Sequence, residues 1–215
     1  MRIVRSALVF ATLVAATVHA GQPPPPPTPP PGAPAQPPPG GRGGRGAGRG
    51  GVQVMTLTSS AWQDGSAIPA KYTQAGDQVS PPLAWSNVPD NIASFVLIAH
   101  DVDSAIGNGA DDILHWMLWN IPAASRSLPE AVAQASQLPD GTRQISASGP
   151  YYRGPGAAAA GPAHHYLFEL FALDAMLDVP AVGTSPLQTR AAVVAAMAGH
   201  IRGKAVYSGL FKRAQ

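Results

Sequence analysis

The sequence has 215 residues, of which 14 are basic and 12 acidic, and it contains no cysteine. The lack of cysteine excludes disulfide bonds, thiolate nucleophiles, cysteine-bound zinc and a lipidated N-terminal cysteine. Five arginines and no acidic residue lie before residue 51, so the remainder of the chain contains nine basic and 12 acidic residues. The net charge of −3 on this part gives no support for a nucleic-acid-binding surface.

Residues 1–20 have the three parts of a secretory signal peptide. Two arginines precede an apolar run from Ser6 to Val18, and small residues flank the expected cleavage site after Ala20. A membrane anchor is the alternative, but the apolar run is shorter than the ~20 residues that span a bilayer. We therefore expect an exported protein that is periplasmic or secreted.

Residues 21–51 are predicted to be a disordered linker. From Gln22 to Pro39, twelve of eighteen residues are proline, which favours an extended polyproline II rod. Residues 40–51 are glycine interspersed with three arginines and one alanine, and they hold no large apolar residue able to join a core. Such a tract can bind RNA or anionic surfaces weakly, but in an exported protein a flexible spacer facing the cell envelope is the favoured interpretation.

Residues 52–215 are long enough to form one domain with a single core. Their apolar runs are short, rich in branched and aromatic residues, and separated by Pro, Gly, Asn and Asp, which is typical of strands joined by turns. The sequence therefore predicts a mainly β domain. We expect strands at 52–58, 94–100, 113–121, 165–173 and 205–211, and helices at 128–136 and in the alanine-rich stretch 186–198.

The segment 113–120 is apolar on both faces, which predicts a central strand covered on each side. His115 interrupts this run, and a polar ring inside such a strand needs hydrogen-bonding partners. Because an isolated buried histidine is more often a satisfied core residue than a binding group, His115 alone does not indicate a site.

In the run from His164 to Leu173, a strand's period of two puts His164 and Tyr166 on the same face. An imidazole and a phenol side by side at a strand entrance can both donate hydrogen bonds to an anion. This segment alone is equally consistent with a polar pair that has no binding role.

The segment His100–Ser104 ends an apolar run at the point where a strand meets a loop, a usual place for functional groups. Asp101 and Asp103 share a face if the chain stays extended. These carboxylates and His100 could ligate a metal, but the histidine spacing of helical zinc sites is missing, and an ordinary solvated loop is the stronger interpretation.

Taken in order, five segments resemble the successive blocks of the phosphatidylethanolamine-binding protein family, in its bacterial Raf-kinase-inhibitor-like branch. The resemblance spans nearly the whole domain. It implies two antiparallel β-sheets with peripheral helices, and one small pocket for phosphate-like or carboxylate-like anions, including phospholipid head groups. The segments are 80–89 (SPPLAWSNVP), 100–104 (HDVDS), 111–122 (DDILHWMLWNIP), 161–174 (GPAHHYLFELFALD) and 199–213 (GHIRGKAVYSGLFKR).

By the family's motifs, the resemblance implies a pocket formed by Asp101, His115, Pro155, His164 and Tyr166. The histidines and the tyrosine would donate to the anion's oxygens, while Asp101 orients an imidazole or receives an ammonium. With ordinary histidine pKa values of about 6.5, anion binding should tighten as the pH falls toward about 5.5, provided that burial does not lower those values.

The expected pocket departs from the family's usual pattern in several places. Val102 and Ser104 stand where relatives usually have Pro and Ala, and His165 replaces a common arginine. In the rim loop, Ala157–Ala160 replace prolines and often a cysteine, and Phe211 replaces a tyrosine.

We predict a binding protein for a small anion such as phosphate or phosphoethanolamine, with no cofactor, no metal and no nucleic acid. Regulation of an envelope protein partner, inhibition of an envelope protease through a protein interface, and a homodimer stay open. Hydrolase activity is less favoured, because the sequence has no Gly-x-Ser-x-Gly motif, no cysteine and no glycine-rich phosphate loop.

Overall fold

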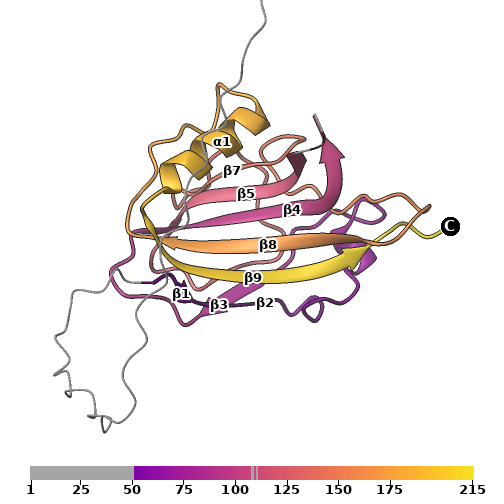
Figure 1. Ribbon diagram of the computed structural model, residues 1–215, viewed down its shortest axis with the longest axis horizontal. Helices are drawn as coiled ribbons and strands as arrows, with labels where there is room; N and C mark the ends of the chain where they lie inside the picture. The colour runs from indigo at the N-terminus through magenta and orange to yellow at the C-terminus, as the bar shows by residue number, and fades with distance from the viewer. Residues whose placement is uncertain (1–50, 108, 110) are drawn as a thin grey trace, which may run out of the picture. The chain divides into compact units, whose positions relative to one another are not determined.

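The computed structural model describes residues 51–215 apart from 108 and 110 (Figure 1). The predicted signal peptide (1–20) and all of the predicted linker (21–51) except Gly51 lie outside the described residues. Within the described ranges, no helix combines the length and the apolar character that crossing a membrane requires.

The described chain is mainly β, as predicted from the sequence. It has nine strands, one α-helix and one short 3-10 helix. In chain order, the elements are β1 (Gln53–Val54), β2 (Thr56–Thr58), η1 (Ala70–Tyr72), β3 (Leu83–Ser86), β4 (Ser94–Ile106), β5 (Asp111–Pro122), β6 (Ser127–Leu128), β7 (Arg143–Ile145), β8 (His164–Leu173), α1 (Pro186–Met197) and β9 (Ile201–Phe211).

The strands form two sheets. The larger has the order β1-β9-β8-β4-β5-β7 and the smaller the order β2-β3-β6. Every pair is antiparallel except β1 with β9, in which Gln53 lies beside Gly203. The prediction of a two-sheet fold is confirmed, with this one parallel pair added at the edge.

The larger sheet is buried on both faces because its long strands alternate apolar side chains between two cores. In β4, Phe95 and Leu97 enter a core shared with the smaller sheet, while Val96 and Ile98 enter a core beneath α1. In β5, Trp116 enters the core shared with the smaller sheet and Trp119 enters the core beneath α1, and both are fully buried. The expectation that this segment is a central strand covered on each side is confirmed.

The predicted strand 52–58 is in fact two strands that belong to different sheets. The chain changes sheet at Met55, whose N–H donates to the carbonyl of Lys204 at 2.8 Å. Beyond it, Leu57 pairs with Trp85 in the smaller sheet. The other four predicted strands are confirmed and extend by one or more residues, whereas the short strands β3, β6 and β7 were not predicted.

The predicted helix at 186–198 is confirmed as α1, and a capping box closes its N-terminus. The Ser185 hydroxyl accepts from the N–H of Gln188, and the Gln188 side chain accepts from the N–H of Ser185 in return. Pro186 occupies the first turn, where no N–H is needed. Figure 1 shows α1 lying across β4, β5 and β7, against which it buries Val193 and Met197.

The predicted helix at 128–136 is wrong. Leu128 belongs to β6, and the segment that follows has no helix. Its backbone is held by distant groups instead: the N–H groups of Ala131 and Val132 donate to the carbonyl and hydroxyl oxygens of Ser80. Ala131 also has a φ of 60°, which a helix does not allow. Tertiary hydrogen bonds therefore override the local helical tendency.

Candidate functional site

Asp101 of β4 and His164 of β8 meet at the end of the larger sheet. Nδ1 of His164 lies 2.9 Å from Oδ2 and 3.1 Å from Oδ1 of Asp101. Because a carboxylate accepts, Nδ1 carries the proton, and Asp101 fixes the orientation of the ring. Of the two roles expected for Asp101, this contact favours orienting an imidazole over receiving an ammonium.

Asp101 is 3% exposed and is held by its own strand as well as by His164. Its Oδ1 accepts from the N–H groups of Asp103 and Ser104, each at 3.1 Å. The Ser104 hydroxyl donates to the carbonyl of Asp101 at 2.8 Å and accepts from the N–H of Ile113 at 2.9 Å. Ser104, which departs from the family's usual alanine, is thus part of the support for the carboxylate.

His115 of β5 is 3% exposed and has a fixed tautomer. Its Nδ1 lies 2.8 Å from the carbonyl oxygen of Arg153, so Nδ1 donates. Its buried Nε2 has no hydrogen-bond partner among the described residues. Burial lowers the pKa of His115, and this outweighs the opposing effects of the Arg153 carbonyl and the Asp101 carboxylate.

Tyr166 of β8 is 1% exposed and lies between His115 and the loop that follows β7. Its ring meets the imidazole edge-on, with centroids 5.1 Å apart. Its hydroxyl accepts from the N–H groups of Gly156 and Ala157 at 3.3 and 3.2 Å. Burial, together with the nearby Asp101 carboxylate, raises the pKa of Tyr166 to about 12, so the phenol stays protonated at neutral pH.

Pro155, the fifth residue assigned by the resemblance, does not line the cavity. Its carbonyl accepts from the N–H of Gln74 at 2.9 Å, and the Gln74 side chain donates to the carbonyl of Gly154 at 2.8 Å. These bonds tie the loop to the segment after η1, so Pro155 lies in the support of the site.

The structure gathers Asp101, His115 and His164 around one cavity of about 220 Å³, with Tyr166 directly behind it. Sequence reasoning missed other wall residues. Arg153 could have been noticed as a cation two residues before the assigned Pro155, whereas nothing in the sequence marks Gln74 or Ile113. The residues that line the cavity are Gln74, Asp101, Ser104, Ile113, His115, Arg153, Gly156, Ala157, Ala158 and His164.

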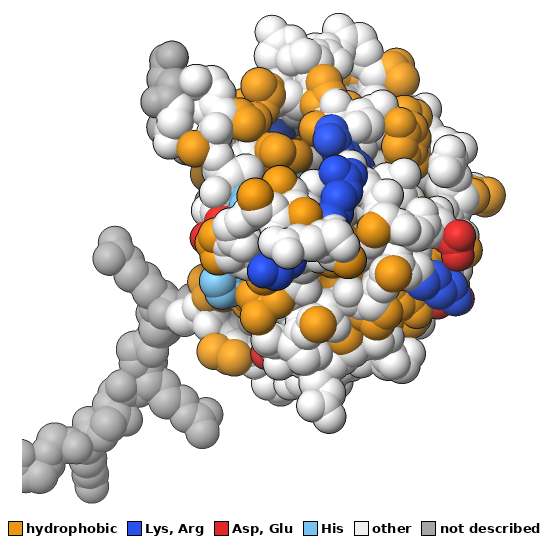
Figure 2. Space-filling model, turned by 90° about the vertical axis from the view of Figure 1, so that its right-hand side faces the viewer, with side chains coloured by type: hydrophobic (Ala, Val, Ile, Leu, Met, Phe, Trp, Pro, Cys, Tyr) orange, Lys and Arg blue, Asp and Glu red, His pale blue; other side chains and the backbone are white. Residues whose placement is uncertain are grey.

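A second histidine and aspartate pair lies beside the cavity. His165 is exposed, and its Nδ1 lies 2.7 Å from Oδ2 of Asp103, which also accepts the His165 N–H at 2.6 Å. Figure 2 views the end of the molecule at which β8 begins and β9 ends, where histidine and basic side chains lie among hydrophobic ones. Within the described ranges, no group of three or more His, Cys, Asp or Glu side chains is arranged to hold a metal ion.

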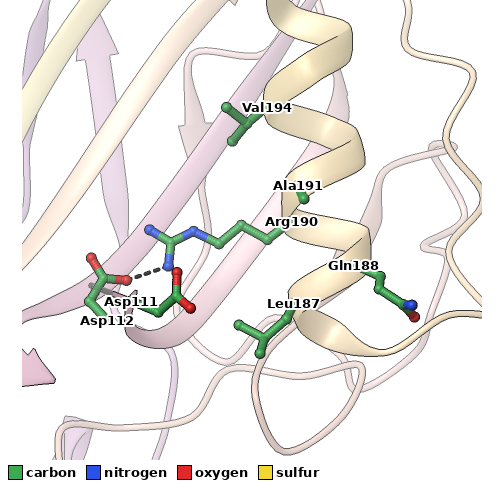
Figure 3. A pocket seen from close by; sticks show the side chains of 7 residues that line it. All are labelled: Asp111, Asp112, Leu187, Gln188, Arg190, Ala191 and Val194. Atoms are coloured by element: carbon green, nitrogen blue, oxygen red, sulfur yellow. Dashed lines mark hydrogen bonds and ion pairs between the residues drawn. The ribbon is translucent and has the colours of Figure 1, made fainter. Parts of the chain in front are cut away.

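A larger groove of about 470 Å³ lies between α1 and the start of β5 (Figure 3). Arg190 of α1 crosses it to an ion pair with Asp112, while Leu187 and Val194 form an apolar edge. The Arg190 guanidinium is therefore already paired with Asp112, and the groove contains none of the site residues assigned by the resemblance.

Behind that groove, His100 is enclosed by two carboxylates. Its Nδ1 lies 2.5 Å from Oδ2 of Asp112, and its Nε2 lies 3.3 Å from Oε2 of Glu169, an ion-pair contact without hydrogen-bond geometry. Burial alone would lower the pKa of His100, but the two carboxylates raise it to about 9. His100 is thus a charged structural residue of the core beneath α1.

Two packed β-sheets with a peripheral helix place the chain in the class of β-sandwich proteins. The family model described as phosphatidylethanolamine-binding protein matches residues 58–212. The chain belongs to this family, as the resemblance in its sequence motifs implied.

The relatives support the same family and fold. A UPF0098 protein of Methanothermobacter thermautotrophicus is 38% identical over 161 residues, which cover 74% of this chain and 99% of that protein. The Mycobacterium tuberculosis protein LppC, provisionally named a lipoprotein, is 31% identical over 160 residues, 74% of each chain. The crystal structure of a Chlamydia trachomatis protein provisionally described as a phosphatidylethanolamine-binding protein homologue is 29% identical, with a TM-score of 0.59 over 75% of this chain and 99% of that one.

Proposed function

We propose that this domain is a binding protein for a small oxyanion, phosphate-like or carboxylate-like, in the cavity between Asp101, His115 and His164. The observation that carries the proposal is that two imidazoles from different strands line the same cavity and one of them is oriented by a buried carboxylate. Because Nδ1 of each ring donates to Arg153 or to Asp101, Nε2 of each ring is left for the ligand: it donates to an anion oxygen when the ring is protonated and accepts from a P–OH group when the ring is neutral.

The walls of the cavity agree with an anionic guest of head-group size. Arg153 supplies a cation on one side, and the segment 156–158 brings backbone to the other. At about 220 Å³, the cavity lies below the range of roughly 300 to 1,000 Å³ that is typical for drug-sized ligands. This size suits phosphate or the phosphoethanolamine head group of the lipid for which the family is named, and not the lipid's acyl chains.

We propose that the domain binds without catalysing a reaction. The pair Asp101–His164 resembles the carboxylate and imidazole of a catalytic triad, which needs a nucleophile within reach. Ser104 is the serine that lines the cavity, and its hydroxyl is engaged with the backbone of Asp101 and Ile113. These contacts argue for a structural hydroxyl.

We also propose that the protein acts in the cell envelope or outside the cell. The signal-peptide pattern of residues 1–20 supports export. The relative LppC carries a name that associates it with the envelope, which agrees with this placement.

Calorimetric titration of the full chain with inorganic phosphate and with phosphoethanolamine tests the anion proposal. The variant His164→Ala should bind at least about tenfold more weakly, since a hydrogen bond to a charged group contributes roughly 1.5–3 kcal/mol. The matched control is His165→Ala, the next residue along β8, whose exposed ring pairs with Asp103 outside the cavity wall. It should change the affinity by less than twofold.

Two results would contradict the proposal. One is that neither anion binds the wild-type chain at millimolar concentration. The other is that His164→Ala, shown to be folded by its thermal unfolding curve, keeps the wild-type affinity.

A further inference from the structure

We propose that the anion in this cavity is bound together with a proton: the preferred ligand is a phosphomonoester or inorganic phosphate in its monoanionic form, whose P–OH group donates to Nε2 of His115. This inference rests on the proposed anion-binding function. It adds a selectivity for phosphomonoesters over phosphodiesters, which follows from the hydrogen-bonding state of one ring.

The tautomer of His115 is set by the backbone of Arg153, in the segment between β7 and β8. The carbonyl oxygen of Arg153 lies 2.8 Å from Nδ1 of His115. Because a carbonyl oxygen can only accept a hydrogen bond, the ring carries its proton on Nδ1. In a neutral imidazole the other nitrogen is then an acceptor. Nε2 is buried, on a side chain that is 3% exposed, and it has no hydrogen-bond partner in the described part of the chain. A donor from a bound ligand would supply the missing bond.

A second proton on His115 is disfavoured by its surroundings. The ring is buried, and among the charged groups around it the Arg153 guanidinium opposes a further positive charge. The Asp101 carboxylate on β4 favours that charge, but its oxygens are already engaged by His164 and two backbone N–H groups. On β8, Tyr166 stays neutral at ordinary pH. The condition attached to the sequence-based expectation, that burial leave the histidine pKa unchanged, is therefore not met at His115.

The two classes of phosphate ester differ in the group that Nε2 needs. A phosphomonoester has a second pKa of about 6, so its monoanion carries a P–OH donor. A phosphodiester has no such proton, and its free oxygens would place lone pairs against the lone pair of Nε2. A monoester can bind with its own proton, whereas a diester requires His115 to be protonated first. Monoester affinity should then fall as the pH rises above 6, because the dianion must take up a proton on binding.

Calorimetry with methyl phosphate and dimethyl phosphate tests the inference on the full chain. At pH 6.5, methyl phosphate should bind at least tenfold more tightly than dimethyl phosphate. From pH 6.5 to 7.5 its affinity should fall severalfold, approaching tenfold per pH unit. At pH 7.5, titrations in two buffers of different ionisation enthalpy should report an uptake of nearly one proton per methyl phosphate bound.

The variant His115→Gln separates this proton from other titrations. A glutamine amide can donate from the place of Nε2 without titrating, so the proton uptake should vanish and the preference for the monoester should shrink to less than threefold. His165→Gln, on the exposed rim, should keep both. If His115→Gln does not fold, the affinities of the wild-type chain for methyl phosphate and dimethyl phosphate still test the inference.

The outcomes distinguish the two proposals. Equal affinity for the two esters, tighter binding of the diester, or proton uptake that persists in His115→Gln would overturn the inference and leave the anion-binding function standing. If methyl phosphate, dimethyl phosphate and inorganic phosphate all fail to bind, both proposals are overturned.

Discussion

His100 and Asp101 are neighbours in β4, yet their side chains serve opposite faces of the larger sheet. His100 enters the core beneath α1, where it contacts Asp112 and Glu169. Asp101 turns to the cavity and orients His164. Because successive strand residues point to opposite faces, one dipeptide supplies both a structural charge and a site carboxylate. The surroundings of each side chain lead to separate predictions.

We predict that His100 stabilises the fold at neutral and acidic pH and loses this effect in alkali. Its pKa in the folded protein is about 9, above the 6.5 of an unfolded chain, so the folded state holds the proton more tightly. The contribution is fully present below pH 6.5 and is lost as the pH rises through about 9. A shift of this size corresponds to on the order of 3 kcal/mol.

Urea unfolding of wild type and His100→Gln at several pH values between 6 and 9.5 measures this effect. The difference in the free energy of unfolding should shrink by about 3 kcal/mol across that range, because nearly the whole contribution is lost between pH 6 and 9.5. His165→Gln, at an exposed histidine, should show no comparable trend. A constant difference for His100→Gln would mean that the residue stabilises the protein by packing alone.

We predict that Arg190→Met destabilises the protein by about 2 kcal/mol, since the partly buried Asp112 loses one of its two cationic partners. Methionine keeps much of the apolar stem, so the change isolates the charge. Arg202→Met is the control: Arg202 is exposed and pairs with Asp174, an interaction that contributes less than about 1 kcal/mol. Equal losses in the two variants, measured by urea unfolding, would contradict this anchoring role for Arg190.

We predict that Gly154→Ala destabilises the protein by roughly 1–3 kcal/mol and weakens phosphate binding. A Cβ at this position would lie 2.7 Å from the carbonyl oxygen of Tyr72 and 2.8 Å from Cα of Thr73. Both are backbone atoms, so no rotamer change relieves the clash, and the loop that follows must move. Gly51→Ala, whose Cβ would meet no atom within 4 Å, is the control for thermal unfolding and calorimetry. An unchanged melting temperature for Gly154→Ala would contradict the prediction.

We predict that Asp101→Asn changes the tautomer of His164 from one fixed on Nδ1–H to a mixture. The asparagine can still accept from the backbone N–H groups, but it loses the charge-assisted bond to Nδ1, a bias of roughly 1.5–3 kcal/mol. Nitrogen-15 NMR of the imidazole reports the tautomer directly. Asp103→Asn should change the signals of His165 and leave those of His164 unchanged. If the His164 signals are the same in Asp101→Asn and in wild type, Asp101 does not orient the ring.

Much of the β framework could be predicted because the physical signal is local. Residues adjacent in the sequence show both the apolar run around Trp116 and the alternation that puts Tyr166 and Phe168 in one core. The helix α1 was equally visible, because its alanine-rich body has no internal glycine and ends at Gly199. The strands β6 and β7, of two and three residues, are too short to show a period, and the failed helix at 128–136 was decided by Ser80, far away in the chain.

The family, the mainly β fold, the buried central strand and the placement of His164 and Tyr166 on one face could all be predicted from the amino-acid sequence. The folded structure was needed to show that Asp101, 63 residues earlier, orients His164, and that the carbonyl of Arg153, 38 residues beyond His115, sets the tautomer of His115. Hydrophobic periodicity is a property of adjacent residues, whereas the direction of a hydrogen bond depends on which distant backbone the fold brings within 3 Å.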